Sequence, residues 1–284
     1  MRPPPSLIVL ALLGLAAPAH TRAKPLGAQE ILVKAENVRN PDLEYAVDFT
    51  IHGVSRGDAV VERDASYGMI ASGKDRSVIL MRSPDMLYGA LVLMAEGRSF
   101  MLLPKASKAW ELSAAQMVNG DVASGDLARS NLTRGYAATV AGEDDLDGVR
   151  CWRLELQSEN TAMHYPRIVY WVAQSGFLPR QLDHYGRSGK LLKTVRYGDY
   201  RKGALGLRSM QLTIESFSEW KEGCTLTFTN LRKLKSGPEP FTPEGMIRLR
   251  DAALAAREAT GGVDAPFERI LRTAAADKPT DSKR

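Results

Sequence analysis

Apolar and polar residues alternate with a period of two along most of the chain, beginning near residue 43. Tyr45, Val47, Phe49 and Ile51 occupy alternate positions, and Asp48 and Thr50 lie between them. Successive side chains of a β-strand point to opposite faces, so this pattern predicts a strand with one face buried in an apolar interior. Similar runs predict further strands at 59–67, 77–81, 91–94, 100–103, 150–157, 167–173, 178–185, 191–200, 210–215 and 225–229.

The apolar spacing becomes helical near the two ends of the chain. Residues 28–38 carry apolar side chains at helical spacing and end before Pro41. Thr242 and Pro243 supply an N-cap and a first helical residue for a helix at 243–258. About ten short strands at hairpin spacing with few helices predict a mainly β fold. We expect an incomplete, strongly curved antiparallel β-barrel with N- and C-terminal helices.

The segment 105–136 lacks the period of two and forms a long excursion between strands. Met117, Val118 and Leu127 are apolar residues within it. A large exposed apolar surface promotes association, so a concave apolar face needs a cover. We expect 114–129 to form a helical lid over that face. A loop packed permanently on the sheet is the alternative.

Composition and charge exclude several classes of protein. The 284 residues are 44% hydrophobic and 25% charged, which is ordinary for a globular chain. The formal net charge is +5, and Lys and Arg are scattered among acidic residues. A scattered, mildly basic surface differs from the basic stripe of a nucleic-acid-binding protein. We therefore expect no nucleic-acid partner. We also expect a monomer.

The first residues have the pattern of a secretory signal peptide. Arg2 precedes an apolar run at 7–17, and Ala17-Pro18-Ala19 supplies the small residues that a signal peptidase requires. The apolar run is too short for an ordinary membrane anchor of about 20 residues. We expect export to the periplasm, with cleavage after Ala19 or Ala23. The expected divisions are a signal peptide at 1–19, a half-barrel domain at 24–242, a C-terminal helix at 243–260 and a polar, disordered tail at 261–284.

The two cysteines leave two alternatives open. Cys151 and Cys224 are too few for a disulfide scaffold or a four-cysteine zinc site. Two cysteines in an oxidising compartment often pair. However, the alternation places them on opposite strand faces, which favours two separately buried thiols.

The residue combinations that carry enzyme chemistry are absent from the sequence. His52, His164 and His184 lie in separate segments without metal-ligand spacing. A nucleophile elbow, a phosphate loop and a dinucleotide fingerprint are also missing. The acidic cluster 143–148 lacks the spacing of a calcium loop, and we interpret it as a solvated hairpin turn ending in Asp147-Gly148. The sequence thus indicates a protein that is not an enzyme and has no cofactor or metal.

Three stretches together resemble a known family. The first is 82–93 with Pro84 and Gly89, and the second runs from Phe100-Met101-Leu102-Leu103-Pro104 to the Gly125-Asp126-Leu127 region. The third is 170–194, which reads YWVAQSGFLPRQLDHYGRSGKLLKT. Their order and spacing resemble the bacterial outer-membrane lipoprotein-sorting family, the relatives of the periplasmic carrier LolA. The resemblance covers roughly residues 28–242, and the helix and tail after Phe241 are an extension beyond it.

The resemblance implies a half-barrel with a helical lid over a concave apolar face. Members of the family carry lipid or acyl chains through the periplasm, so it implies lipid or lipoprotein acyl chains as ligands. An inner-membrane transporter or an outer-membrane acceptor is then an expected partner. Trp171, Pro179, Gly189 and Lys193 match the family pattern. We interpret these four as determinants of the fold and not as ligand contacts.

The alternation also selects candidate lining residues for the apolar concavity. Each lies on the predicted inner face of a strand: Tyr45, Val47, Phe49, Ile51, Trp152, Leu154, Leu156, Tyr170, Leu212, Ile214, Leu226 and Phe228. Each acyl methylene removed from water contributes about 0.8 kcal/mol, so burial alone can hold a chain. The same faces would also suit a packed core without a cavity. The alternative function is a periplasmic sensor or adaptor that binds a membrane-protein domain through the same fold.

Overall fold

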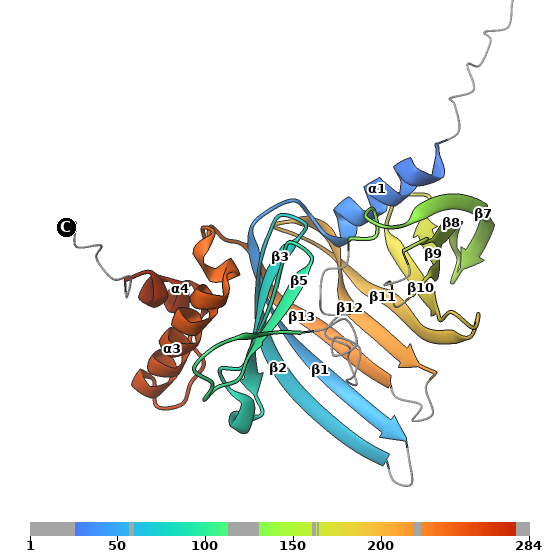
Figure 1. Ribbon diagram of the computed structural model, residues 1–284. Coiled ribbons are helices and arrows are strands. Elements are labelled where there is room, and N and C mark those ends of the chain that lie inside the picture. Colours follow the sequence, from blue (N-terminus) through green and yellow to red (C-terminus); the bar gives the residue numbers. More distant parts are fainter. Residues whose placement is uncertain are drawn as a thin grey trace, which may run out of the picture.

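One large antiparallel sheet dominates the computed structural model (Figure 1), which describes residues 26–56, 60–112, 131–160, 163, 165–217 and 223–276. The described part of the chain contributes thirteen strands to this sheet. They are β1 (Tyr45–Arg56), β2 (Val60–Ser72), β3 (Arg76–Ser83), β4 (Leu91–Ala95), β5 (Arg98–Leu102), β6 (Trp110–Glu111), β7 (Ala137–Leu146), β8 (Val149–Gln157), β9 (Arg167–Ala173), β10 (Pro179–Tyr185), β11 (Leu191–Gly203), β12 (Gly206–Ser216) and β13 (Gly223–Lys233).

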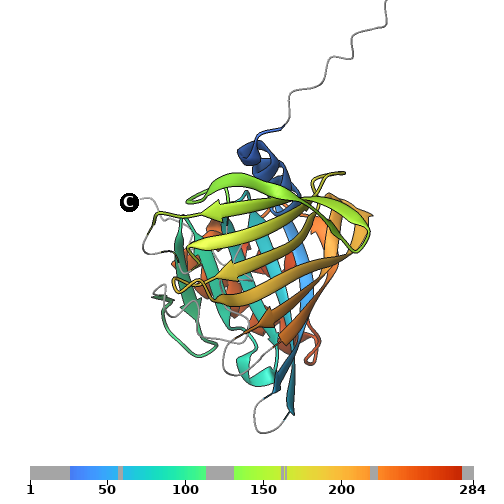
Figure 2. The same ribbon diagram turned by 90° about the vertical axis from the view of Figure 1, so that its right-hand side faces the viewer.

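The strand order makes the sheet an incomplete barrel. It runs β6-β5-β4-β3-β2-β1-β13-β12-β11-β10-β9-β8-β7, so the first and last strands in sequence lie side by side at its centre. Every neighbouring pair is antiparallel. The sheet curls around a concave face without its two edge strands meeting (Figure 2). The predicted fold class, a mainly β incomplete barrel, is confirmed.

The concave face carries one of two apolar cores. Helix α1 (Ala28–Arg39) closes one end of the concavity, where it lies across the strands on the β7 side of the sheet (Figure 1). Its buried residues Ile31, Leu32 and Ala35 join the inward side chains of β1 in this core. Helical spacing on α1 and a period of two on β1 thus bring their apolar faces together.

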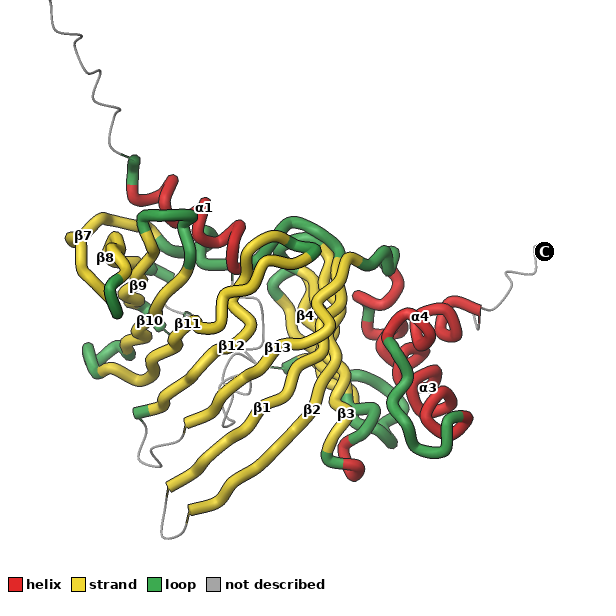
Figure 3. Tube along the Cα trace, turned by 180° about the vertical axis from the view of Figure 1, so that it is seen from behind, coloured by secondary structure: helices red, strands yellow, loops and turns green. Residues whose placement is uncertain are grey.

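The opposite, convex face carries the second core, which the C-terminal helices cover. These are α3 (Pro243–Ala259) and α4 (Phe267–Ala276), and both lie outside the barrel beside β2, β3 and β4 (Figures 1 and 3). Ile70, Leu80 and Leu93 point outward from the sheet and pack with Leu249 and Phe267 of these helices. Two single-turn helices, η1 (Asp85–Leu87) and η2 (Glu239–Phe241), connect neighbouring elements.

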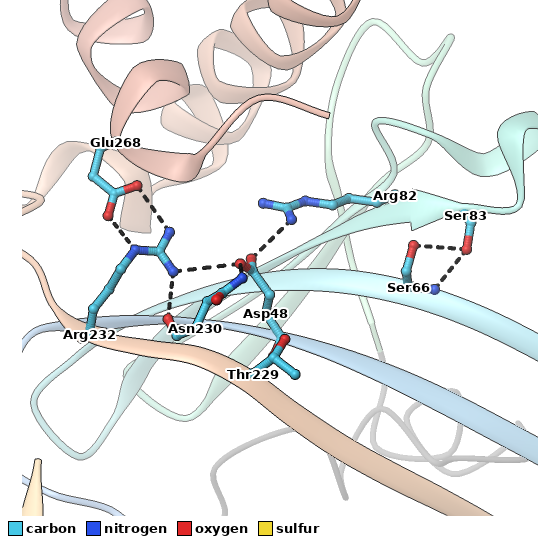
Figure 4. Close-up of polar contacts among 8 residues, drawn as sticks. All are labelled: Asp48, Ser66, Arg82, Ser83, Thr229, Asn230, Arg232 and Glu268. Carbon is cyan, nitrogen blue, oxygen red and sulfur yellow. Dashed lines mark hydrogen bonds and ion pairs between the residues drawn. The ribbon is translucent and has the colours of Figure 1, made fainter. Parts of the chain in front are cut away.

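An ionic network fastens α4 to the convex face of the sheet (Figure 4). Arg232 of β13 donates two hydrogen bonds to the carboxylate of Glu268 on α4, and its Nη1 lies 3.6 Å from Asp48 Oδ2 on β1. Arg82 of β3 approaches the other oxygen of Asp48 at 3.0 Å, and its guanidinium lies 5.4 Å from the centre of the Phe267 ring. Groups from three strands therefore hold one helix through charge-assisted contacts.

Helix α4 corrects the prediction of a disordered tail from residue 261. Residues 267–276 form a helix because Phe267 and Ile270 are completely buried against the convex face of the sheet. Four apolar residues at helical spacing pack in the second core, on the convex face: Phe267, Ile270, Leu271 and Ala274. This short apolar face was not recognised in the sequence because polar residues lie between its members. Helix α3 lies at the predicted C-terminal helix.

Strand β7 was also missed, and it includes much of the acidic cluster read as a turn. The turn itself is only Asp147-Gly148, where both residues have a positive φ, of 53° and 76°. This conformation suits a two-residue hairpin between β7 and β8. Within β7, Asp144 accepts hydrogen bonds from Trp171 of β9 and Arg153 of β8. The acidic residues of this edge strand thus have structural partners.

The four residues matched by the family resemblance lie in different parts of the sheet and its turns, and one of them, Pro179, lines a cavity in the concave face. Trp171 Nε1 lies 2.7 Å from Asp144 Oδ2. Pro179 is buried and its carbonyl oxygen accepts a hydrogen bond from Tyr200, and Gly189 turns the chain with a φ of +78°. Lys193 is buried on the concave side of β11, with Nζ 4.7 Å from the centre of the Tyr165 ring.

No helix in the described part of the chain has the length and apolar character that a membrane crossing requires.

Candidate functional site

A cavity of about 130 Å³ lies in the concave face, between the C-terminal end of α1 and the centre of the sheet. Side chains from α1, from the following residue and from six strands surround it, and most of them are apolar. The lining residues are Val38, Arg39, Asn40, Tyr45, Val47, Phe49, Met69, Pro179, Tyr197, Tyr200, Arg208, Ser209, Met210, Leu212, Leu226, Phe228 and Leu231.

Aromatic rings from three adjacent strands pack together at the apolar wall, where Phe49 and Phe228 line the cavity. The Phe49 ring stacks on Tyr67 of β2 with 4.9 Å between ring centres and contacts Phe228 of β13 at 5.8 Å. Phe49 is directly opposite both residues in the strand register. Cross-strand aromatic pairs of this kind stabilise neighbouring strands. The register of the central strands therefore fixes this wall of the cavity.

The end of the cavity beneath α1 is polar, and a buried ion pair organises it. Glu36 is only 1% exposed and accepts hydrogen bonds from Arg39 Nε and Nη2, at 2.7 and 2.8 Å. It also accepts one from the backbone N–H of Leu132. Burial acts to lower the pKa of Arg39, but the charge and hydrogen bonds of Glu36 outweigh it, so the pKa is raised. Arg39 thus stays cationic where it lines the cavity.

A second arginine reaches the same end from β12. Arg208 donates hydrogen bonds to the carbonyl oxygens of Val38, in the last turn of α1, and Leu205, in the β11–β12 turn. Tyr200 of β11 donates to the carbonyl oxygen of Pro179. These contacts orient polar side chains of β11 and β12 at one end of an otherwise apolar cavity.

Tyr170 lies near this polar end and has an unusual environment. Its side chain is fully buried, and its hydroxyl has no hydrogen-bond partner among the described residues. Burial raises its pKa well above the ordinary value, and the nearby Glu36 and Tyr197 raise it further. A buried hydroxyl without a partner is costly, so its presence requires an explanation.

The predicted lining residues separate into two groups. Six of the twelve line the cavity: Tyr45, Val47, Phe49, Leu212, Leu226 and Phe228. Five others, Ile51, Leu154, Leu156, Tyr170 and Ile214, lie in the concave core outside the cavity, and Trp152 packs against that core. Trp152 stacks on Phe177 with 5.5 Å between ring centres. The alternation identifies the concave face, but the tertiary packing decides which part of it is filled.

Sequence reasoning missed the polar end of the cavity and some of its apolar wall. Met69 and Tyr197 lie at alternate positions of their strands, so the period of two was an available signal for both. Arg39, Asn40 and Arg208 carry no such signal, because a charged or amide residue near the end of a helix or strand is ordinarily solvated. The expected lid residues Met117, Val118 and Leu127 lie outside the described residues, so the lid stays a prediction.

The cysteines and acidic residues form no further chemical centre in the described ranges. Cys151 and Cys224 are both buried and are not joined in a disulfide, and Cys224 belongs to the concave core. Burial is the main cause of the raised pKa of Cys151. Within the described part of the chain, no group of His, Cys, Asp and Glu side chains is arranged to hold a metal ion.

Comparison with known proteins extends the resemblance seen in the sequence. A protein-family model described as "uncharacterized protein" matches residues 73–248, more than half of the chain. A LolA superfamily protein from Nitrosomonas europaea has a similar structure, with 27% sequence identity and a TM-score of 0.69. That similarity covers 78% of this chain and 100% of the other. No curated protein sequence matches the chain.

Two further structures share the fold at lower identity. A DUF1329 family protein from Desulfovibrio piger has 19% identity and a TM-score of 0.69, over 77% of this chain and 97% of the other. An outer membrane lipoprotein-sorting protein domain from Vibrio parahaemolyticus has 15% identity and a TM-score of 0.65, over 78% and 97%. The family model covers more than half of the chain, so the chain belongs to this family of uncharacterized proteins, and the similar structures show that it has the LolA-like fold.

Proposed function

We propose that this protein is a periplasmic carrier that shields acyl chains of lipids or lipoproteins from water. The observation that carries the proposal is the apolar cavity in the concave face of an incomplete barrel. Supporting observations are the signal-peptide pattern at 1–19 and the lipoprotein-sorting domain among its structural relatives. We place the carrier domain at 24–242, with the helices after residue 242 as an addition on its convex face.

The size of the cavity defines how a chain would bind. A cavity of about 150 Å³ holds a benzene-sized group, so the 130 Å³ here accommodate a short segment of hydrocarbon. The remainder of a long chain would then extend along the concave face. Each buried methylene contributes about 0.8 kcal/mol, so even a segment of four contributes about 3 kcal/mol. This type of binding needs shape and apolar surface more than a polar constellation.

Binding of a fluorescent fatty acid tests the proposal, with one variant that fills the cavity. Leu212 is half-buried and lines the cavity, so the larger indole of Leu212→Trp should occupy the volume of the chain. We expect affinity to fall roughly tenfold to a hundredfold, the equivalent of two to four lost methylenes. Fluorescence titration gives the affinity, and circular dichroism checks that the sheet is retained.

A matched variant controls for a new tryptophan on the same strand. Leu207 lies on β12, is 43% exposed and does not line the cavity, so Leu207→Trp should bind the fatty acid as tightly as the unaltered protein. Equal affinity of the folded Leu212→Trp and Leu207→Trp proteins would contradict binding in this cavity.

A further inference from the structure

The cavity combines an apolar wall with a polar, cationic end. Apart from Tyr45 of β1, its polar lining residues come from the C-terminal end of α1 and from β11 and β12. They are Arg39, Asn40, Tyr197, Tyr200, Arg208 and Ser209. None of the described residues that line the cavity is acidic. A ligand that fills this site therefore meets hydrocarbon on one side and guanidinium groups on the other.

The ion pair beneath Arg39 holds its guanidinium in position and leaves an excess of positive charge. Glu36 contacts Arg39 through both carboxylate oxygens but does not itself line the cavity. Two guanidinium groups and one carboxylate carry a net charge of +1 over Glu36, Arg39 and Arg208. Arg208 is oriented by the neutral carbonyl oxygens of Val38 and Leu205. Arginines fixed in this way suit planar or tetrahedral anions.

Tyr170 lies in the concave core near Arg39 but does not line the cavity. Its hydroxyl is completely buried, has no partner among the described residues and is electrostatically coupled to Arg39, Tyr197 and Tyr200. An isolated buried hydroxyl costs free energy that a polar ligand atom or a bridging water recovers.

We propose that the ligand is an amphiphile with an anionic head group, a carboxylate or a phosphate, which binds at Arg39 and Arg208 while its acyl chain lies against the apolar wall. This proposal rests on the proposed carrier function and adds a preference for charge. A neutral amphiphile of the same chain length would gain the apolar contacts but not the charge-assisted hydrogen bonds. The carrier therefore discriminates between acyl ligands by their head groups.

Competition between two ligands of equal chain length tests the preference. Hexadecanoate and hexadecanol are titrated against a bound fluorescent acyl probe at pH 8, and dodecyl phosphate is titrated against dodecanol. We expect each anion to bind about tenfold tighter than its alcohol, the usual effect of a hydrogen bond to a charged group. Inorganic phosphate alone should not displace the probe, because it lacks the apolar contacts.

Variants of Arg208 assign the preference to this site. Arg208→Gln should reduce the ratio of anion to alcohol affinity to near one while hexadecanol binding remains, and Arg208→Lys should retain part of the ratio. The ratio is measured within one protein, so a general loss of stability does not alter it. Arg196 on β11 is half-exposed and pairs with Glu215 away from the cavity, so Arg196→Gln is the matched control and should leave the ratio unchanged.

The possible outcomes separate the two proposals. Equal affinity of the unaltered protein for hexadecanoate and hexadecanol would overturn the head-group preference and leave the carrier function standing. An unchanged ratio in Arg208→Gln would also overturn the assignment to this site. Failure of every acyl ligand to displace the probe would contradict the carrier function itself.

Discussion

Gly68 shows how a single residue sets the distance between a helix and the sheet. It lies on β2, directly opposite Asp48 and Leu80 in the strand register, and faces the convex core. A Cβ atom at this position would overlap the Phe267 ring of α4 and lie 2.9 Å from Arg82 Nη2. The absence of a side chain therefore allows Phe267 and Arg82 to stack closely over the strand.

Replacement of this glycine should displace α4 from the sheet. Gly68→Ala forces the Phe267 ring away, and overpacking of this kind costs about 1–3 kcal/mol of the free energy of unfolding. Gly53→Ala on β1 makes the same chemical change where the nearest atom to the new Cβ is 3.7 Å away, so its stability should change by less than about 0.5 kcal/mol. Urea unfolding of both variants measures the difference. Equal stabilities would show that α4 does not pack here as described.

The environments of Tyr170 and Arg208 cannot be predicted from the pattern of residues along the chain. Both residues acquire their environment from distant parts of the chain, since Arg208 meets the carbonyl oxygen of Val38 across 170 residues. Tyr170 shares its strand face with other buried residues, yet only the fold brings its hydroxyl near Arg39. Alternation predicts that such residues point inward, but not what they meet there.

Among the elements, α4 is held to the sheet by the ion pair of Glu268 with Arg232 and by the burial of Phe267 and Ile270. The hydrogen bonds from Arg232 are the main cause of the lowered pKa of Glu268. A carboxylate with a lowered pKa stabilises the folded state above its unfolded pKa, near 4.5. That contribution disappears as the pH falls through the lowered pKa. Acid should therefore loosen the attachment of α4.

Thermal unfolding at several pH values tests this attachment. The protein should unfold at a higher temperature than Glu268→Gln above about pH 4.5, and the difference should shrink as the pH falls further. Glu258→Gln changes an exposed carboxylate of α3 and serves as the control, with little effect expected at any pH. A difference between the protein and Glu268→Gln that is the same at pH 3 and pH 7 would contradict the role of the ion pair.

The elements also show how far the sequence predicts this fold. Most strands were found from their apolar residues, and β9 was predicted with the bounds that it has, at 167–173. Edge strand β7 reads AATVAGEDDL and has only half-buried or exposed residues, so no buried face marks it. Helix α4 had a usable signal in Phe267 and Ile270, but its importance depends on a convex core that the sequence does not reveal.

At the scale of the whole molecule, the sheet separates two apolar cores, and only the concave one contains the cavity. The convex core is covered by α3 and α4, whereas the concave core is closed by α1 at one end and contains the cavity (Figures 1 and 3). Filling one face with helices while leaving space on the other stabilises the sheet without occupying the site. The C-terminal helices thus act as support for the wall of the cavity.

Photo-crosslinking tests the binding of acyl chains in the concave cavity most directly. A fatty acid with a diazirine near the end of its chain is bound to the protein, irradiated, and located by mass spectrometry of peptides. We expect labels in peptides from β1, β12 and β13 that line the cavity, such as those with Phe49, Leu212 and Phe228. Excess unlabelled fatty acid and the Leu212→Trp substitution should both remove them. Labels confined to α3 and α4, or labels that persist in the presence of excess fatty acid, would contradict binding in the cavity.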